Sequence, residues 1–154
     1  MRRQFHISNA DPERGQRFLE ALSLENLKSF EASRIDQISG GLDRDDDRLR
    51  LVIFDELPPQ QRFTAARAAF LGWVHSAPGA HLVTGALTRD QQASRAFAAE
   101  MLAPTGYIRM RASNRMLSDH AIDEIAQVLR APAGAVRYQA EHAGIHVVGS
   151  RGWG

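Results

Sequence analysis

Histidine and carboxylate side chains occur in one region at a spacing that suits metal chemistry. His75 and His81 lie close together in the sequence, and Asp90 and Glu100 follow them along the chain. Two imidazoles and a carboxylate form a ligand set that holds zinc and lowers the pKa of a bound water. A metal site built from His75, His81 and one of these acids is therefore one interpretation. The alternative is that these histidines are helix caps or surface residues, as isolated histidines at helix ends more often are.

A second pair, His142 and His146, has the i, i+4 spacing of the two histidines in an H-E-x-x-H zinc-peptidase helix. However, no glutamate follows His142, so the general base of that motif is missing. Gly144 also lies between the two histidines, and glycine at such a position is typical of a helix end. We interpret this pair as a helix terminus.

The composition is that of an ordinary globular domain and excludes several classes of site. The chain has 154 residues, of which 44% are hydrophobic and 24% are charged, enough for one domain with a sizeable core. A net charge of +1 gives no overall electrostatic case for binding nucleic acid or an anionic membrane. The absence of cysteine excludes disulfides, thiolate zinc ligands and a thiol nucleophile. No apolar run reaches the roughly 18–20 residues needed to cross a bilayer. We therefore expect a single soluble domain over residues 1–154, located in the cytoplasm, with no membrane partner.

The middle of the chain predicts a strand followed by a helix. Residues 49–54 are short, branched and apolar, which is typical of a strand. Pro58 and Pro59 separate this strand from residues 61–75, where apolar side chains recur at helical spacing. The expected buried face of that helix consists of Phe63, Ala66, Phe70 and Trp73. Residues 81–84 predict a second short strand.

The remaining elements are expected to be mainly helical. Two helices are predicted at residues 11–22 and 23–38, the second ended by Gly40 and Gly41. Thr88 and Gln91 form a capping-box pattern, in which the two side chains satisfy the first free amides of a helix that stops before Pro104.

A basic loop at 109–115 then leads to a helix that starts at Ser118 or Asp119. A last helix spans 133–143, with Gly144 at its C-terminal cap. A short strand is expected at 145–148, followed by a frayed tail. The fold class predicted from these elements is α+β, mainly helical.

Two segments resemble the ImmA/IrrE family of zinc metallopeptidases. The first is R-F-T-A-A at residues 62–66, and the second is R-A-F-A-A-E-M-L-A-P at residues 95–104. In that family an R-F-T-x-A segment leads into H-E-x-x-H, and a later helix carries F-A-A-x-x-L-x-P with an acidic metal ligand upstream. The resemblance covers residues 49–104 and extends loosely to Gly144. It implies a zincin-like core with a small sheet packed on helices, plus a C-terminal helical pair.

The positions that carry the family's chemistry hold other residue types. The first histidine position is Arg67, the glutamate position is Ala68, and the second histidine position is Leu71; the neighbourhood of the acidic ligand, residues 91–94, reads Q-Q-A-S. A guanidinium does not ligate zinc, alanine is no base, and leucine has no lone pair. The resemblance therefore implies a degenerate core, 49–104, that has no catalytic residue. No zinc or other cofactor is expected, although the family binds zinc. This favours a domain that is not an enzyme.

The residues at and near these replaced positions predict a polar cluster in place of the metal. Arg62, Arg67 and Glu100 are expected to lie close together, where a buried arginine–carboxylate pair would hold two helices in register. His75 lies one turn beyond Leu71 on roughly the same helix face, and we include it in this substitute site. The alternative is that Arg67 is a surface arginine with no special role.

Residues 118–145 have the pattern of a helix-turn-helix subdomain. In a DNA-reading version Arg137, Gln139 and His142 would face the major groove and Arg130 would contact a phosphate. Four nearby acidic residues offset these arginines: Asp119, Asp123, Glu124 and Glu141. Helix-turn-helix geometry also serves as ordinary packing, and comparable helices follow the peptidase core in the family that the chain resembles.

Three functions remain open at this point. The leading hypothesis is a non-catalytic ImmA/IrrE-like domain in a bacterial cytoplasm, acting as a regulatory or protein-interaction module. The resemblance implies mobile-element or stress-response regulation, with a repressor as the protein partner. The second hypothesis is a helix-turn-helix DNA-binding regulator, and the third is an active zinc peptidase with unconventional ligands.

Overall fold

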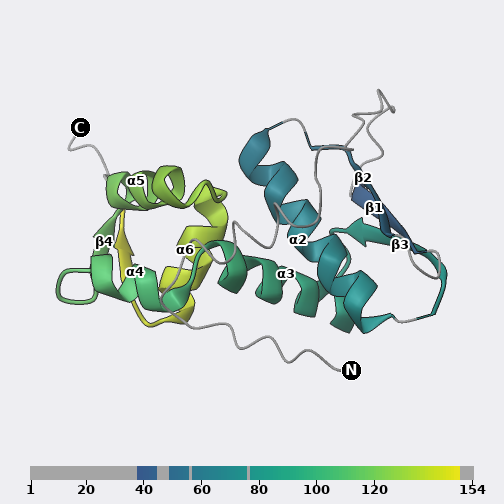
Figure 1. The fold of residues 1–154 in the computed structure, drawn as a ribbon. Coiled ribbons are helices and arrows are strands. Elements are labelled where there is room, and N and C mark those ends of the chain that lie inside the picture. The colour runs from purple at the N-terminus through teal and green to yellow at the C-terminus, as the bar shows by residue number, and fades with distance from the viewer. Residues whose placement is uncertain (1–37, 45–48, 56, 76, 150–154) are drawn as a thin grey trace.

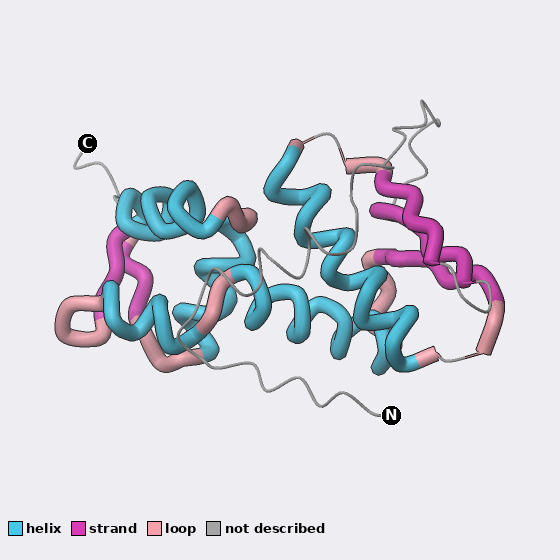
Figure 2. Tube along the Cα trace, viewed as in Figure 1, coloured by secondary structure: helices cyan, strands magenta, loops and turns pink. Residues whose placement is uncertain are grey.

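The computed structural model describes residues 38–44, 49–55, 57–75 and 77–149. The fold class is α+β and mainly helical in this part of the chain, as predicted (Figures 1 and 2). The predicted helix at 11–22, residues 23–37 of the predicted helix at 23–38 and the tail from residue 150 lie outside the described residues. The last residue of that second helix, Ile38, instead begins a strand. The elements, in chain order, are β1 (Ile38–Arg44), β2 (Leu49–Ile53), α2 (Pro58–Val74), β3 (Gly79–Thr84), α3 (Arg89–Leu102), α4 (Thr105–Arg111), β4 (Met116–Ser118), α5 (Asp119–Leu129), α6 (Ala133–His142) and β5 (His146–Val148).

Strand β1 is the centre of a three-stranded antiparallel sheet with the order β2-β1-β3. Gly40 and Gly41, expected to end a helix, instead lie inside this central strand. A Cβ atom on Gly40 would lie 2.5 Å from the Val52 carbonyl oxygen and 3.0 Å from Cγ2 of Thr64. The glycine therefore lets the sheet approach α2 closely, a role that local sequence does not distinguish from a helix stop.

Helix α2 packs against both the sheet and α3. Prolines begin it, where their missing amide hydrogens cost nothing. Residues 64–69 are all buried, because alanines make the helix thin enough to be covered on two sides. Trp73, predicted to be buried, is 74% exposed, so that part of the predicted face is wrong. Periodicity places a residue on a helix face but does not show how far the covering layers extend.

Helix α3 connects the two halves of the molecule, with the sheet near its start and the C-terminal helices near its end (Figure 1). Its predicted N-cap is confirmed, since the Thr88 hydroxyl accepts a hydrogen bond from the Gln91 amide at 3.4 Å. Pro104 ends it, as expected, but also serves as the N-cap residue of α4. Residues 109–111 of the predicted basic loop at 109–115 are therefore helical, because proline is compatible with a helix start.

Helices α5 and α6 form a pair joined by the turn at residues 130–132. Ser118 caps α5 by accepting a hydrogen bond from the Ala121 amide at 3.1 Å, as predicted. The predicted strand near 145–148 is present as β5, and it pairs in parallel with β4, which was not predicted. The larger apolar core lies under these C-terminal elements and reaches α2 and α3, whereas a smaller one lies between the sheet and α2. None of the described helices has the length and apolar character required to span a membrane.

Candidate functional site: an arginine-lined cavity

One face of α2 presents polar side chains toward α3 and α6. Gln60, Thr64 and Arg67 follow one another at intervals of four and three residues, which places them on the same side of the helix. Arg67 is only 5% exposed. A charged side chain is rarely buried to this extent unless its hydrogen bonds are satisfied inside the protein.

The guanidinium of Arg67 links three elements through neutral acceptors. Its Nη2 donates to the Thr84 carbonyl oxygen at 2.6 Å and to Oε1 of Gln91 at 2.7 Å, and its Nε donates to Oγ of Ser94 at 3.3 Å. Thr84 ends β3, while Gln91 and Ser94 belong to α3. Arg67 therefore holds α2, β3 and α3 together.

Gln91 has a different role from the one predicted. In a capping box its side chain would turn back to the start of its own helix. Instead, Oε1 accepts from the Thr84 amide at 3.1 Å as well as from Arg67, and Nε2 donates to the Leu82 carbonyl at 2.6 Å. The capping-box pattern is thus only half used for capping, and its glutamine orients the arginine.

The charge on Arg67 is retained at neutral pH despite its burial. Desolvation, reinforced by the nearby positive charge of Arg95 and opposed by the negative charge of Asp55, lowers the pKa of Arg67 to about 10. Within the described chain no carboxylate forms an ion pair with either arginine. Positive charge is therefore concentrated at one place in the molecule.

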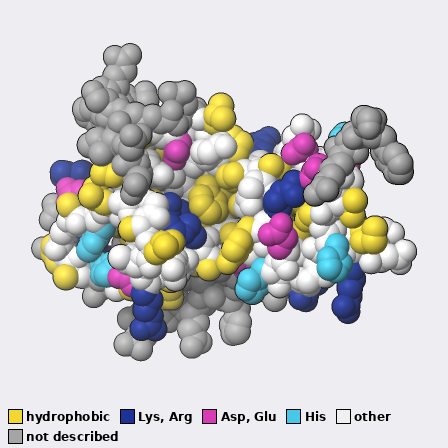
Figure 3. All heavy atoms as spheres, turned by 180° about the vertical axis from the view of Figure 1, so that it is seen from behind, with side chains coloured by type: hydrophobic (Ala, Val, Ile, Leu, Met, Phe, Trp, Pro, Cys, Tyr) yellow, Lys and Arg dark blue, Asp and Glu magenta, His cyan; other side chains and the backbone are white. Residues whose placement is uncertain are grey.

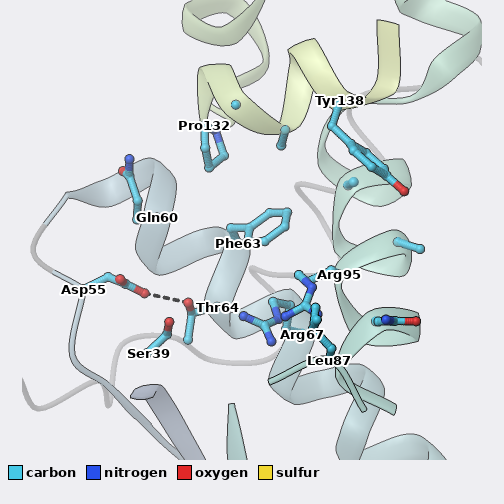
Figure 4. A pocket seen from close by; sticks show the side chains of 15 residues that line it. Ser39, Asp55, Gln60, Phe63, Thr64, Arg67, Leu87, Arg95, Pro132 and Tyr138 are labelled. Carbon is cyan, nitrogen blue, oxygen red and sulfur yellow. Dashed lines mark hydrogen bonds between the residues drawn. The ribbon is translucent and has the colours of Figure 1, made fainter. Parts of the chain in front are cut away.

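Arg67 and Arg95 line a cavity of about 650 Å³ between α2, α3 and the start of α6 (Figure 4). Asp55 also lines it, and its Oδ2 accepts a hydrogen bond of 2.5 Å from the Thr64 hydroxyl. Phe63, Leu87 and Tyr138 supply apolar surface. In Figure 4 the two guanidinium groups lie beside each other, with Phe63 between them and the first turn of α6. This arrangement can bind and orient an anion.

The residues at the three positions that the resemblance relates to zinc chemistry have separate environments. Ala68 and Leu71 are 1% and 2% exposed and pack with Leu42 and Val83 in the smaller core. Only Arg67, at the first of these positions, lines the cavity. The contacts from Arg67 to Gln91 and Ser94 bring together the two segments that the resemblance relates to the metal site.

The predicted arginine–carboxylate pair is wrong in its partners. Arg62 donates to the carbonyl oxygens of Leu129 at 3.2 Å and Arg130 at 3.0 Å, which ties α2 to the end of α5. Glu100 accepts from the Thr105 hydroxyl at 2.7 Å and from Nε2 of Gln139 at 2.5 Å. The three residues were expected to lie close together, but their side chains contact different elements. Arg62 contacts the end of α5, Arg67 contacts β3 and α3, and Glu100 contacts α4 and α6.

His75 belongs to a cluster separate from Arg67. Its ring stacks on that of His81 with centroids 4.5 Å apart and planes 17° apart, and its Nε2 lies 3.1 Å from Oδ2 of Asp90. Stacked imidazoles direct their in-plane lone pairs nearly parallel, so the pair does not converge on one ion. In the described residues no group of three or more His, Cys, Asp or Glu side chains could hold a metal. The predicted His75–His81–acid cluster forms, but its geometry does not suit coordination.

The predicted DNA-reading surface is wrong for Gln139, which is 5% exposed and bonded to Glu100. Arg137 donates to Asp119, and this hydrogen bond raises the pKa of Arg137. Arg130 and His142 are exposed. In the view from behind the molecule, basic and acidic side chains are interspersed (Figure 3). These contacts support the packing interpretation of the α5–α6 pair.

Sequence reasoning missed Arg95, Asp55 and Thr64. Arg95 lies one helical turn after Gln91, and Thr64 lies one turn before Arg67. The spacing therefore places Arg95 on the same helix face as Gln91, and Thr64 on the same face as Arg67. Nothing in the sequence indicates that α6 would lean over these faces to enclose a cavity. In comparisons with known proteins, neither a family model nor a curated protein matches the chain.

Proposed function

We propose that this chain is a non-catalytic ImmA/IrrE-like domain with a zincin-like core, acting as a regulatory or protein-interaction module. Its partner is a regulatory protein such as a repressor, in mobile-element or stress-response regulation. The observation that carries the proposal is the contact between Arg67 and residues Gln91 and Ser94. These are the segments where the resembled family places a zinc-binding histidine and its acidic ligand, and here an arginine links them.

The chemistry available around Arg67 supports binding without cleavage. A metallopeptidase needs ligands that lower the pKa of a water and a carboxylate that takes its proton. Ala68 and Leu71, at the base and second-histidine positions, are packed in the apolar core. Arg67 performs a structural task instead, since its hydrogen bonds fix β3 and α3 against α2. A partner docking on this core would be held and released intact.

The zinc content of the protein, purified without a histidine tag, is the first test. We expect much less than one zinc per chain by elemental analysis, and no cleavage of a casein or repressor substrate with added zinc. As a matched check on the assay, an active H-E-x-x-H peptidase should contain stoichiometric zinc and cleave the same substrate. Stoichiometric zinc in this chain, lost together with proteolysis on chelation, would refute the proposal.

Partner binding is the second test. A candidate repressor mixed with the chain should co-elute with it in size-exclusion chromatography and keep its intact mass in mass spectrometry. A truncated repressor would contradict the non-catalytic role, and separate elution of every candidate repressor would contradict the proposed partner class.

A further inference from the structure

The two cavity arginines share one backbone acceptor. Arg67 donates to the Thr84 carbonyl through Nη2 at 2.6 Å, and Arg95 donates to the same oxygen through Nη1 at 3.4 Å. Arg95 also donates to the Ala86 carbonyl through Nη2 at 2.8 Å. Two guanidinium groups on one oxygen repel each other, and the partly enclosed setting weakens the screening that water would provide. A bound anion between them would offset this repulsion.

Donor capacity remains on both arginines. In the part of the chain that the structure describes, Nη1 of Arg67 and Nε of Arg95 donate no hydrogen bond. A guanidinium offers five donors in a planar fork that matches the oxygens of a carboxylate or phosphate. Among the described residues neither arginine has a carboxylate partner, and the neutral acceptors around them leave this fork partly unused.

The other charges around the cavity do not cancel the positive ones. Asp55 is the only acidic residue among the described lining residues, and one of its oxygens is engaged by Thr64. Two positive charges thus face one negative charge. The first turn of α6 also borders the cavity, and it carries no side-chain cap. The positive end of that helix dipole adds to the preference for an anion.

The rest of the cavity wall suits an apolar body. Leu87 is 80% exposed and Tyr138 is 52% exposed, although both are large hydrophobic side chains. In Figure 4 Phe63 and Tyr138 lie on the α6 side of the two guanidinium groups, and Leu87 lies next to Arg67 on the opposite side. Exposed hydrophobic residues beside a cavity are typical of ligand sites. Oε1 of Gln60, which also lines the cavity, is buried without a hydrogen-bond donor. It can accept from a hydroxyl or amine on the ligand.

We propose that this cavity binds a small organic anion, with its carboxylate or phosphate head on Arg67 and Arg95 and its apolar body against Phe63 and Tyr138. The volume of about 650 Å³ lies within the range of small-molecule pockets, roughly 300–1,000 Å³. The proposal goes beyond the regulatory role and does not depend on it: ligand binding is measured on the chain alone, whereas the regulatory role is tested by zinc content and by a protein partner.

Titration of the full ¹⁵N-labelled chain with four probes tests the site by NMR. The probes are phenylacetate, phenyl phosphate, inorganic phosphate and the neutral 2-phenylethanol. We expect at least one aromatic anion to bind saturably with a Kd of about 1 mM, shifting the amides of residues 63–67 and 91–96. The neutral alcohol should bind at least about tenfold more weakly, because it forms no charge-assisted bonds. Inorganic phosphate should bind more weakly than phenyl phosphate, since it lacks the apolar body.

Arg95→Gln is the test variant and Arg89→Gln its matched control. Both remove one positive charge from α3, but Arg89 is exposed and does not line the cavity. Arg95→Gln should weaken anion binding by about tenfold or more, with Arg89→Gln close to wild type. Arg95→Lys keeps the charge without the fork and should be intermediate, which also keeps the test informative if the glutamine variant misfolds.

The binding results distinguish a carboxylate ligand from a phosphate ester. Binding of phenylacetate alone assigns a carboxylate ligand, and binding of phenyl phosphate alone assigns a phosphate ester. The site is disproved by unsaturable shifts with both aromatic anions, by equal binding of the neutral alcohol, or by an affinity that Arg95→Gln leaves unchanged.

Discussion

The two ends of α3 carry polar clusters of opposite charge, in which Arg67 is buried and Glu100 is half-buried. Near its start the Arg67 cation is bonded to Thr84, Gln91 and Ser94, and near its end the Glu100 carboxylate is bonded to Thr105 and Gln139. Both charges lie at the unfavourable end of the α3 dipole. Neither has an ion-pair partner among the described residues. Each charge is therefore held by neutral hydrogen-bonding groups.

The clusters differ in how completely the charge is compensated. Glu100 also accepts from the Thr105 backbone amide, 3.3 Å from each carboxylate oxygen, at the start of α4. The start of a helix favours negative charge, so the dipole of α4 stabilises the Glu100 carboxylate and offsets the unfavourable effect of the α3 dipole. No helix end in the described part of the chain does the same for Arg67, and Arg95 adds a second cation. The negative charge of Glu100 is therefore compensated by its neighbours, whereas the positive charge of the Arg67 cluster is compensated less and favours an anion.

Removing the central cation should have the largest effect. Arg67→Met preserves much of the side-chain volume but removes the shortest hydrogen bonds to the Gln91 side chain and to the Thr84 carbonyl. We expect the free energy of unfolding to fall by about 3 kcal/mol, measured by urea denaturation. Arg89→Met, on the exposed surface of α3, should change it by less than about 0.5 kcal/mol. An equal effect of the two variants would show that the Arg67 cluster does not stabilise the fold.

A second carboxylate beside Glu100 tests the other cluster. Gln139→Glu replaces a donor with a like charge and should cost about 2 kcal/mol at neutral pH. Repulsion raises the pKa of the pair in the folded state, so the unfolded state binds fewer protons than the folded one as pH falls. The loss should therefore shrink on acidification, when one carboxyl becomes protonated and donates to the other. Gln127→Glu, at an exposed position of α5, should show no such pH dependence of the free energy of unfolding in parallel urea titrations.

The helix caps on the two sides allow a smaller, paired test. Ser118→Ala should lower the free energy of unfolding by about 1 kcal/mol. Thr88→Ala should cost less, because its bond to the Gln91 amide is 3.4 Å long compared with 3.1 Å for Ser118. Thermal unfolding of both variants in one buffer measures the order. A larger loss for Thr88 would mean that its hydroxyl supports the Arg67 cluster as well as the helix.

The exposed ion pair between Asp119 and Arg137 should matter least. Asp119→Asn should lower the Tm slightly at low salt, and the difference from wild type should disappear in about 1 M NaCl. Differential scanning calorimetry at two salt concentrations measures both values. A salt-independent loss would place this pair with the buried clusters rather than with the surface.

The sequence allows the elements to be predicted better than the site. Branched residues in β2 and capping side chains at Thr88 and Ser118 act locally, so their patterns are readable. Gly40 misleads because the contact that requires a glycine comes from Val52 and Thr64, which are distant in sequence. Trp73 misleads because helical spacing carries no information on where the covering layers end.

Of the residues in the Arg67 cluster, the sequence analysis named only Arg67 as a site residue, at a position that the resemblance implied. Its contacts with Gln91 and Ser94 were not predicted, because the expected neighbours were Arg62, His75 and Glu100. The predicted Glu100 partner failed because adjacent helices present many side chains to one another, and only the packing of α6 decides that Glu100 turns to Gln139. Spacing places Arg95 on the same face of its helix as Gln91, but nothing in the sequence indicates that Arg95 shares the Thr84 carbonyl with Arg67.

The parallel pairing of β4 with β5 has a consequence for the order of folding. Ser118 is both the last residue of β4 and the cap of α5, whereas its partner Val148 follows the whole α5–α6 hairpin. We therefore expect the two strands to pair after both helices have formed, because their contact closes a long intervening segment. Protection of these strand amides in pulsed hydrogen exchange should appear last, marking the moment at which the C-terminal half is complete.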